Sequence, residues 1–161
     1  MLKYINYAIA FQEVPDEVSL CINISNCPNH CKGCHSQYLW EDKGTILNEE
    51  TLSKLIDQNN GITCVSFMGG DNDSNQVKEL AQSIKENYDL KVCWYSGKSL
   101  LTNFDYTPFD FVKTGPYIKE LGGLDNLNTN QRFYKVVNKY DKFLYSTFED
   151  ITYKFQENGR S

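Results

Sequence analysis

The sequence contains very little arginine. Only two of its 16 basic residues are arginines, Arg132 and Arg160, and the excess of acidic residues gives a formal net charge of −5. The isoelectric point of the sequence is about 5.0. Proteins that bind nucleic acid usually carry a basic patch, so this composition argues against that class. Arg132 is the one internal arginine that could bind an anion through two nitrogens at once.

Long apolar runs are absent as well. No run approaches the roughly 20 residues that a helix needs to cross a bilayer, so we expect no membrane span. The first residues, MLKYINYAIAFQEVPDEV, have a short apolar part that is followed at once by acidic residues, which is not typical of a secretion signal. We therefore expect a cytoplasmic protein.

Internal repeats, low-complexity tracts and linkers are also missing. The 161 residues are 40% hydrophobic and 23% charged, which is an ordinary balance for a globular chain. A chain of this length can bury a core without disulfides, so we expect a single domain over residues 1–161. Residues 25–40 form a cysteine-rich loop within it. Residues 138–161 are a C-terminal extension that fits either a hairpin or a helix.

Hydrophobic periodicity predicts alternating strands and helices. Short apolar runs indicate strands over residues 7–11, 17–25, 61–67, 90–96, 109–115 and 131–138. Amphipathic patterns indicate helices over residues 48–60 and 74–88 and a short helix over residues 99–104. Asn48 is expected to cap the first helix. The alternation indicates an α/β fold with a parallel sheet, in which ligands bind at the carboxyl ends of the strands.

The six cysteines fall into two groups. Cys64 and Cys93 lie in the apolar runs ITCVSF and KVCWY, and Cys21 lies in SLCINIS. A disulfide framework is not expected in a reducing cytoplasm, so we interpret these three as small apolar groups of the core. The remaining three, in CPNHCKGC at residues 27–34, have the spacing C-x3-C-x2-C.

Three clustered cysteines can hold a metal in two ways. A structural zinc site needs four protein ligands, for which His30 or His35 would have to serve, and no second ligand pair follows in the sequence. A cubane iron–sulfur cluster normally takes four thiolates, so three would leave one iron open. In an enzyme that open iron is a binding position. Gly33 removes a side chain where the loop must turn tightly or a ligand must come close.

The spacing C-x3-C-x2-C resembles the signature of the radical S-adenosylmethionine superfamily. The resemblance implies that Cys27, Cys31 and Cys34 hold a [4Fe–4S] cluster and form the catalytic centre. It implies that the open iron binds S-adenosylmethionine. One electron from the cluster would then cleave the sulfonium and yield a 5′-deoxyadenosyl radical.

The segment FMGGDND resembles the glycine-rich motif of the same superfamily. The resemblance implies that Gly69, Gly70 and Asp71 lie beside the methionine end of S-adenosylmethionine, although Asn72 stands where proline is usual. The alternative is an ordinary strand-to-helix turn in which Asp71 or Asp73 caps the helix.

Four segments resemble the small activating enzymes of anaerobic ribonucleoside-triphosphate reductase, over about residues 18 to 137. They are NCPNHCKGCHSQYLW, CWYSGKS, FVKTGPY and NTNQRFYKV. Thr114 departs from the aspartate that is usual in the third. This family has a reduced barrel, so the resemblance implies an α/β fold with a small incomplete β/α barrel, a mainly parallel sheet and an active site at the C-terminal ends of the strands.

Further ligand-binding residues follow from the resemblance alone. Gly33, Cys34 and His35 would lie beside the adenine, Ser96 would orient the ligand, and Asn130 or Arg132 would meet its ribose or carboxylate. Each has a simpler alternative. His35 could be only a loop residue, Ser96 a turn residue, and Arg132 a surface charge.

The resemblance also implies an enzyme that acts on a partner protein. The product would be a glycyl radical on anaerobic (class III) ribonucleoside-triphosphate reductase, whose glycine loop is the substrate, with reduced flavodoxin or a similar carrier as electron donor. Two alternatives stay open. The chain could activate another glycyl-radical enzyme, such as pyruvate formate-lyase, or it could be a zinc- or cluster-binding module without catalysis.

Overall fold

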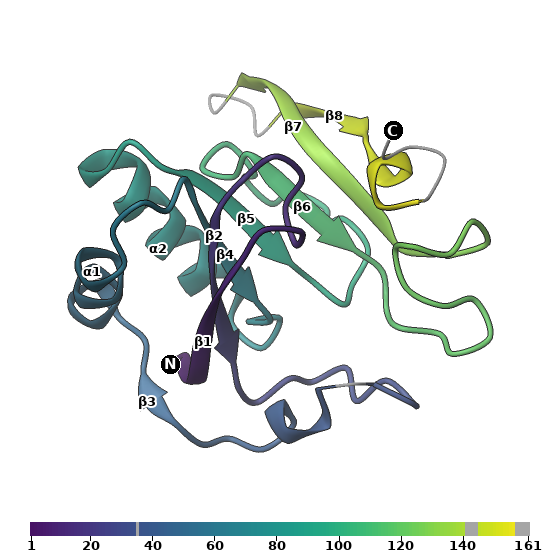
Figure 1. Ribbon diagram of the computed structural model, residues 1–161, viewed down its shortest axis with the longest axis horizontal. Coiled ribbons are helices and arrows are strands. Elements are labelled where there is room, and N and C mark those ends of the chain that lie inside the picture. Colours follow the sequence, from purple (N-terminus) through teal and green to yellow (C-terminus); the bar gives the residue numbers. More distant parts are fainter. Residues whose placement is uncertain (35, 141–144, 157–161) are drawn as a thin grey trace.

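A computed structural model of the chain describes residues 1–34, 36–140 and 145–156, which form one sheet with two α-helices. The eight strands lie in the order β3-β1-β2-β4-β5-β6-β7-β8 (Figure 1). The strands are β1 (Lys3–Ala10), β2 (Ser19–Ile24), β3 (Thr45–Ile46), β4 (Cys64–Met68), β5 (Lys91–Tyr95), β6 (Phe111–Thr114), β7 (Arg132–Tyr140) and β8 (Tyr145–Asp150). The α-helices are α1 (Glu49–Gln58) and α2 (Ser74–Asn87), and η1 (Gln37–Leu39) and η3 (Thr152–Phe155) are short 3-10 turns.

The sheet is mixed, so the prediction of a mainly parallel sheet in an incomplete β/α barrel is wrong. The pairs β2–β4, β4–β5 and β5–β6 are parallel. The four pairs that flank them, β3–β1, β1–β2, β6–β7 and β7–β8, are antiparallel. Parallel neighbours need a crossover of a dozen or more residues, whereas a short link gives an antiparallel pair. The short link over residues 11–18 agrees with the antiparallel pairing of β1 with β2, whereas β6 and β7 pair antiparallel although residues 115–131 separate them.

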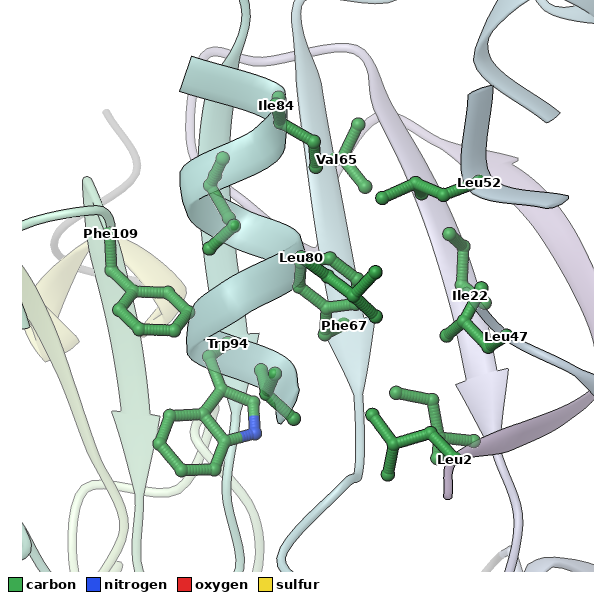
Figure 2. Close-up of a cluster of buried hydrophobic side chains, with 14 of the residues drawn as sticks. Leu2, Ile22, Leu47, Leu52, Val65, Phe67, Leu80, Ile84, Trp94 and Phe109 are labelled. Carbon is green, nitrogen blue, oxygen red and sulfur yellow. The ribbon is translucent and has the colours of Figure 1, made fainter. Parts of the chain in front are cut away.

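The two predicted α-helices are confirmed, with their caps. Asn48 accepts a hydrogen bond from the Thr51 backbone N–H at 3.0 Å, and the Thr51 hydroxyl accepts one from the Asn48 N–H at 2.9 Å. Asp73 caps α2 by accepting from the Gln76 N–H at 3.2 Å. Figure 2 shows Leu80 of α2 packed in the core, whose members are fully or almost fully buried.

The short helix predicted over residues 99–104 is wrong, because this segment is irregular. Asn103 has a φ of 57°, a left-handed conformation that a continuing right-handed turn cannot include. Aromatic side chains hold the segment instead. The rings of Phe104 and Phe109 pack 5.5 and 5.6 Å from the ring of Trp94, between centroids.

Of the two possibilities for the C-terminal extension, the antiparallel pair β7–β8 bears out the hairpin, and residues 141–144 and 157–161 lie outside the described part.

Within the described ranges, neither α-helix is long and apolar enough to cross a bilayer.

Candidate functional site

The carboxyl ends of the four parallel strands meet at a pocket of about 190 Å³. It receives side chains or backbone from the end of β2, from the turns after β4 and β5, from β6, and from the cysteine loop, residues 25–40. The lining residues are Asn23, Ile24, Cys27, Asn29, Cys31, Cys34, Ser36, Leu39, Trp40, Met68, Gly69, Asp71, Tyr95, Ser96, Gly97, Lys113, Tyr117 and Gln131.

The cysteine loop places all three of its thiols at this pocket. Cys27, Cys31 and Cys34 are half-buried and line it together. The Cys27 N–H donates to the Leu39 carbonyl at 3.0 Å, which joins the two ends of the loop, and the Cys34 N–H donates to the Cys31 carbonyl at 3.0 Å, which closes a turn in its middle. Gly33 has a φ of 78°, the left-handed conformation that glycine adopts without strain. The tight turn expected at Gly33 is therefore present.

Two of these sulfurs accept hydrogen bonds. The side-chain nitrogen of Asn29 lies 3.7 Å from the Cys27 sulfur, and the Ser36 backbone N–H donates to the Cys34 sulfur at 3.3 Å. These two donors hold the Cys27 and Cys34 sulfurs in place at the pocket.

The other three cysteines lie in the core, as expected. Cys21, Cys64 and Cys93 are buried in β2, β4 and β5. Burial raises the pKa of the Cys21 and Cys64 thiols to about 12, and it raises the pKa of Cys93 well above its usual value. These groups remain neutral thiols, so the loop cysteines are the better metal ligands.

Three thiols at one pocket match the donor chemistry of a cubane, which takes one thiolate per iron. Among the described residues, no group of three or more His, Cys, Asp or Glu side chains is arranged to hold one metal ion. The ring of His30 stacks on Trp40 at 4.6 Å, and His35 lies outside the described residues, so neither supplies a described fourth ligand for zinc. A cubane takes one thiolate per iron, so its sulfurs surround it instead of converging on one point.

The predicted glycine motif turns sharply at the end of β4. Gly69 and Gly70 have φ values of 113° and 100°. A Cβ at Gly69 would lie 3.1 Å from the Ile24 carbonyl oxygen, and a Cβ at Gly70 would lie 2.5 Å from a Val77 methyl carbon. Gly69 lines the pocket, whereas Gly70 packs against α2. Left-handed backbone and close packing together favour glycine at both positions, and of the two only Gly69 lines the pocket.

Asp71 joins three segments at the wall of the pocket. The residue is 9% exposed, and its carboxylate accepts hydrogen bonds from the Ser96 hydroxyl at 2.5 Å, the Asn29 amide at 2.6 Å and the Gly97 N–H at 2.7 Å. Asp73, not Asp71, caps α2. Asp71 and Ser96 both line the pocket, so the structure brings these two predicted residues together.

Asn130 and Arg132 lie outside the pocket lining. The Arg132 guanidinium contacts the Asp150 carboxylate at 3.3 Å and donates to the Thr129 carbonyl at 3.2 Å. The Asn130 amide donates to the Pro116 carbonyl at 3.0 Å. Gln131, between them, lines the pocket instead.

Lys113 is a pocket residue that sequence reasoning missed. The residue is 9% exposed, and its ammonium group donates to the carbonyls of Ser96 at 3.1 Å and Gly115 at 2.8 Å. Burial lowers its pKa to about 8, an effect that the nearby Asp71 carboxylate and the cysteines of the loop partly offset. A lysine inside the apolar strand FDFVKTG was the signal available in the sequence.

Lys113 is expected to make stability rise with pH in the cluster-free protein. Its folded-state pKa of about 8 lies below the 10.5 of an ordinary lysine, so between these values the unfolded chain binds more protons at this residue. Relative to Lys113→Met, the free energy of unfolding should increase by up to about 3 kcal/mol across that window. Urea unfolding of both proteins at several pH values measures this difference, and parallel pH profiles would contradict it.

A second, larger pocket of about 870 Å³ adjoins the first. The two share Cys34, Ser36, Tyr95, Lys113, Tyr117 and Gln131. The loop between β6 and β7 contributes Gly122, Gly123, Leu124, Asp125 and Asn126 to the larger pocket. Room therefore exists beside the cysteine loop for a ligand larger than the first pocket can hold.

These features agree with an iron–sulfur protein. A family model described as "4Fe-4S single cluster domain" matches residues 18–139, which include the cysteine loop and all of the parallel strands. The chain belongs to that family, and its cofactor is an iron–sulfur cluster. Searches among curated proteins and solved structures found no match.

Proposed function

We propose that Cys27, Cys31 and Cys34 hold a [4Fe–4S] cluster with one iron open, and that the chain is a radical S-adenosylmethionine enzyme. The observation that carries this proposal is that all three thiols line one pocket together with Asp71 and Ser96. When bound, the cluster would supply the electron that cleaves S-adenosylmethionine reductively. No fourth cysteine lines the pocket among the described residues, which supports an open iron.

The protein's own side chains would bind and orient S-adenosylmethionine. Gly69 lets the ligand approach the backbone at the end of β4. Lys113 is the only basic residue lining the pocket in the described part of the chain, and two of its three N–H donors are used by carbonyls. The third donor and the buried positive charge suit the ligand carboxylate. Asp71, whose oxygens already accept three hydrogen bonds, would fix the pocket wall.

The target we propose is a glycyl-radical enzyme, and first of all anaerobic ribonucleoside-triphosphate reductase. A 5′-deoxyadenosyl radical must form within van der Waals reach of the hydrogen that it abstracts, in a site closed to water. The larger pocket adjoins the cysteine loop and could receive a glycine loop of the reductase. Reduced flavodoxin or a similar carrier would supply the electron.

The proposal is tested by anaerobic chemistry in two stages. Protein reduced with dithionite is mixed with S-adenosylmethionine, and 5′-deoxyadenosine and methionine are measured; both are expected. The reductase is then added, and electron paramagnetic resonance is expected to show a glycyl doublet. A doublet that forms with pyruvate formate-lyase and not with the reductase would identify pyruvate formate-lyase as the target. A colourless zinc protein, or a cluster without cleavage, would leave a non-catalytic module and defeat the enzyme proposal.

A further inference from the structure

The side chain of Asn29 bridges the cysteine loop and the pocket wall. Its Nδ2 lies 3.7 Å from the Cys27 sulfur and 2.6 Å from Oδ2 of Asp71. An amide nitrogen carries two hydrogens, so it can donate to both acceptors at once. The half-buried carboxamide is thus the direct link between one thiol of the loop and the carboxylate after β4.

Gly97 leaves the space that this carboxamide occupies. A Cβ at Gly97 would lie 2.5 Å from the Asn29 Nδ2 and 3.0 Å from its Cγ. The Gly97 N–H also donates to Oδ2 of Asp71 at 2.7 Å. Any side chain at position 97 would therefore collide with the Asn29 carboxamide. Asn29 and Gly97 pack against each other although their loops are far apart in the sequence.

We propose that Asn29 is a positioning residue that sets the electron affinity of the cluster through the sulfur of Cys27. The inference rests on the proposed ligand role of Cys27. Reduction places more negative charge on the cluster and its sulfur ligands, so a donor to sulfur stabilises the reduced state more than the oxidised one. Because Asp71 fixes the same amide, the donor is held in place. Loss of the amide should therefore make the cluster harder to reduce.

The test measures the midpoint potential of the cluster in anaerobically purified holoprotein without S-adenosylmethionine. Asn29→Leu keeps a side chain branched at Cγ and removes both donors, and Asn29→Ala removes the group. Both are expected to retain the iron and sulfide of the wild type and to titrate at a more negative potential. Gly97→Ala should shift the potential in the same direction, because its methyl group displaces the carboxamide.

A double variant and a matched control sharpen the test. Asn29→Ala combined with Gly97→Ala should shift the potential no further than Asn29→Ala alone, because the methyl group then has no carboxamide to displace. Gln37→Ala removes a neutral amide from an exposed position of the same loop and should leave the potential unchanged.

A full cluster at the wild-type potential in either Asn29 variant overturns the inference. Loss of the cluster from both variants overturns it too, because Asn29 would then maintain the loop and not the electron affinity of a sulfur. The proposed function fails on different evidence. If the wild type holds a cluster but does not cleave S-adenosylmethionine, the potential shift can still be measured. If the wild type holds no cluster, both ideas fall.

Discussion

Alanine at Cys27, Cys31 or Cys34 is expected to remove nearly all of the roughly four iron atoms of a cubane from anaerobically purified protein. Cleavage of S-adenosylmethionine should disappear with them. All three thiols line one pocket, and no further cysteine lines it among the described residues. The loss of one thiolate would leave two irons without a protein ligand. Iron and sulfide analysis, together with the absorbance of the cluster, measures the effect.

Cys21→Ala is the matched control for these variants. Cys21 lies in β2, next to the cysteine loop in sequence, but it is buried and its pKa is about 12. The substitution removes one small core group and should leave the iron content unchanged. A full cluster in any of the three loop variants, or loss of iron from the control, would refute the assignment of the ligands.

Asp71→Ala should lower the free energy of unfolding of the cluster-free protein by about 3 kcal/mol. Asp71 is 9% exposed, and its carboxylate accepts hydrogen bonds from Asn29, Ser96 and Gly97. Removing it leaves three donors in or near the pocket wall without their acceptor. Urea unfolding measures the change. The cysteine loop should also become more accessible to thiol reagents, because the hydrogen bond from Asn29 to Asp71 is lost.

Two further variants distinguish the loss of the hydrogen bonds to Asp71 from the effect of removing any aspartate. Asp71→Asn keeps the shape and one acceptor oxygen but turns an N–H group toward donors, so it should restore only part of the stability. Asp89→Ala, at an exposed position after α2, should change the free energy of unfolding by no more than about 0.5 kcal/mol. Equal stabilities for Asp71→Ala and Asp89→Ala would show that the network contributes nothing.

Local patterns were enough to predict the two α-helices, although they also predicted a helix over residues 99–104 that is absent. Leu52, Leu55 and Ile56 share one face of α1, and Asn48 stands directly before it, so periodicity and capping chemistry agree. The direction of strand pairing could not be found in this way. Apolar alternation within a strand is the same whether its neighbour runs parallel or antiparallel, so the antiparallel flanks were missed.

In the candidate site, too, local patterns could be predicted and contacts between distant segments could not. The three loop cysteines are close in sequence, and their spacing alone groups them. Lys113 stands out as a charge inside an apolar strand, but its sequence does not show which carbonyls it meets, and no local pattern marks Asn29 as a pocket residue. Arg132 has the positive charge that binding a ligand carboxylate would need, but in the structure it pairs with the Asp150 carboxylate on the neighbouring strand β8.

The order of the strands along the chain bears on how the protein acquires its metal. Ribosomes release the thiols of residues 27–34 together with β1 and β2, before the carboxylate of Asp71 and the turn at Gly97 exist. During that interval the nascent loop has sulfur donors and the end of β2, but it lacks the walls that follow β4 and β5 and the side chain of Lys113 in β6. Cluster delivery should therefore succeed only on chains synthesised at least through β6, and shorter nascent fragments should bind iron weakly and exchange it freely.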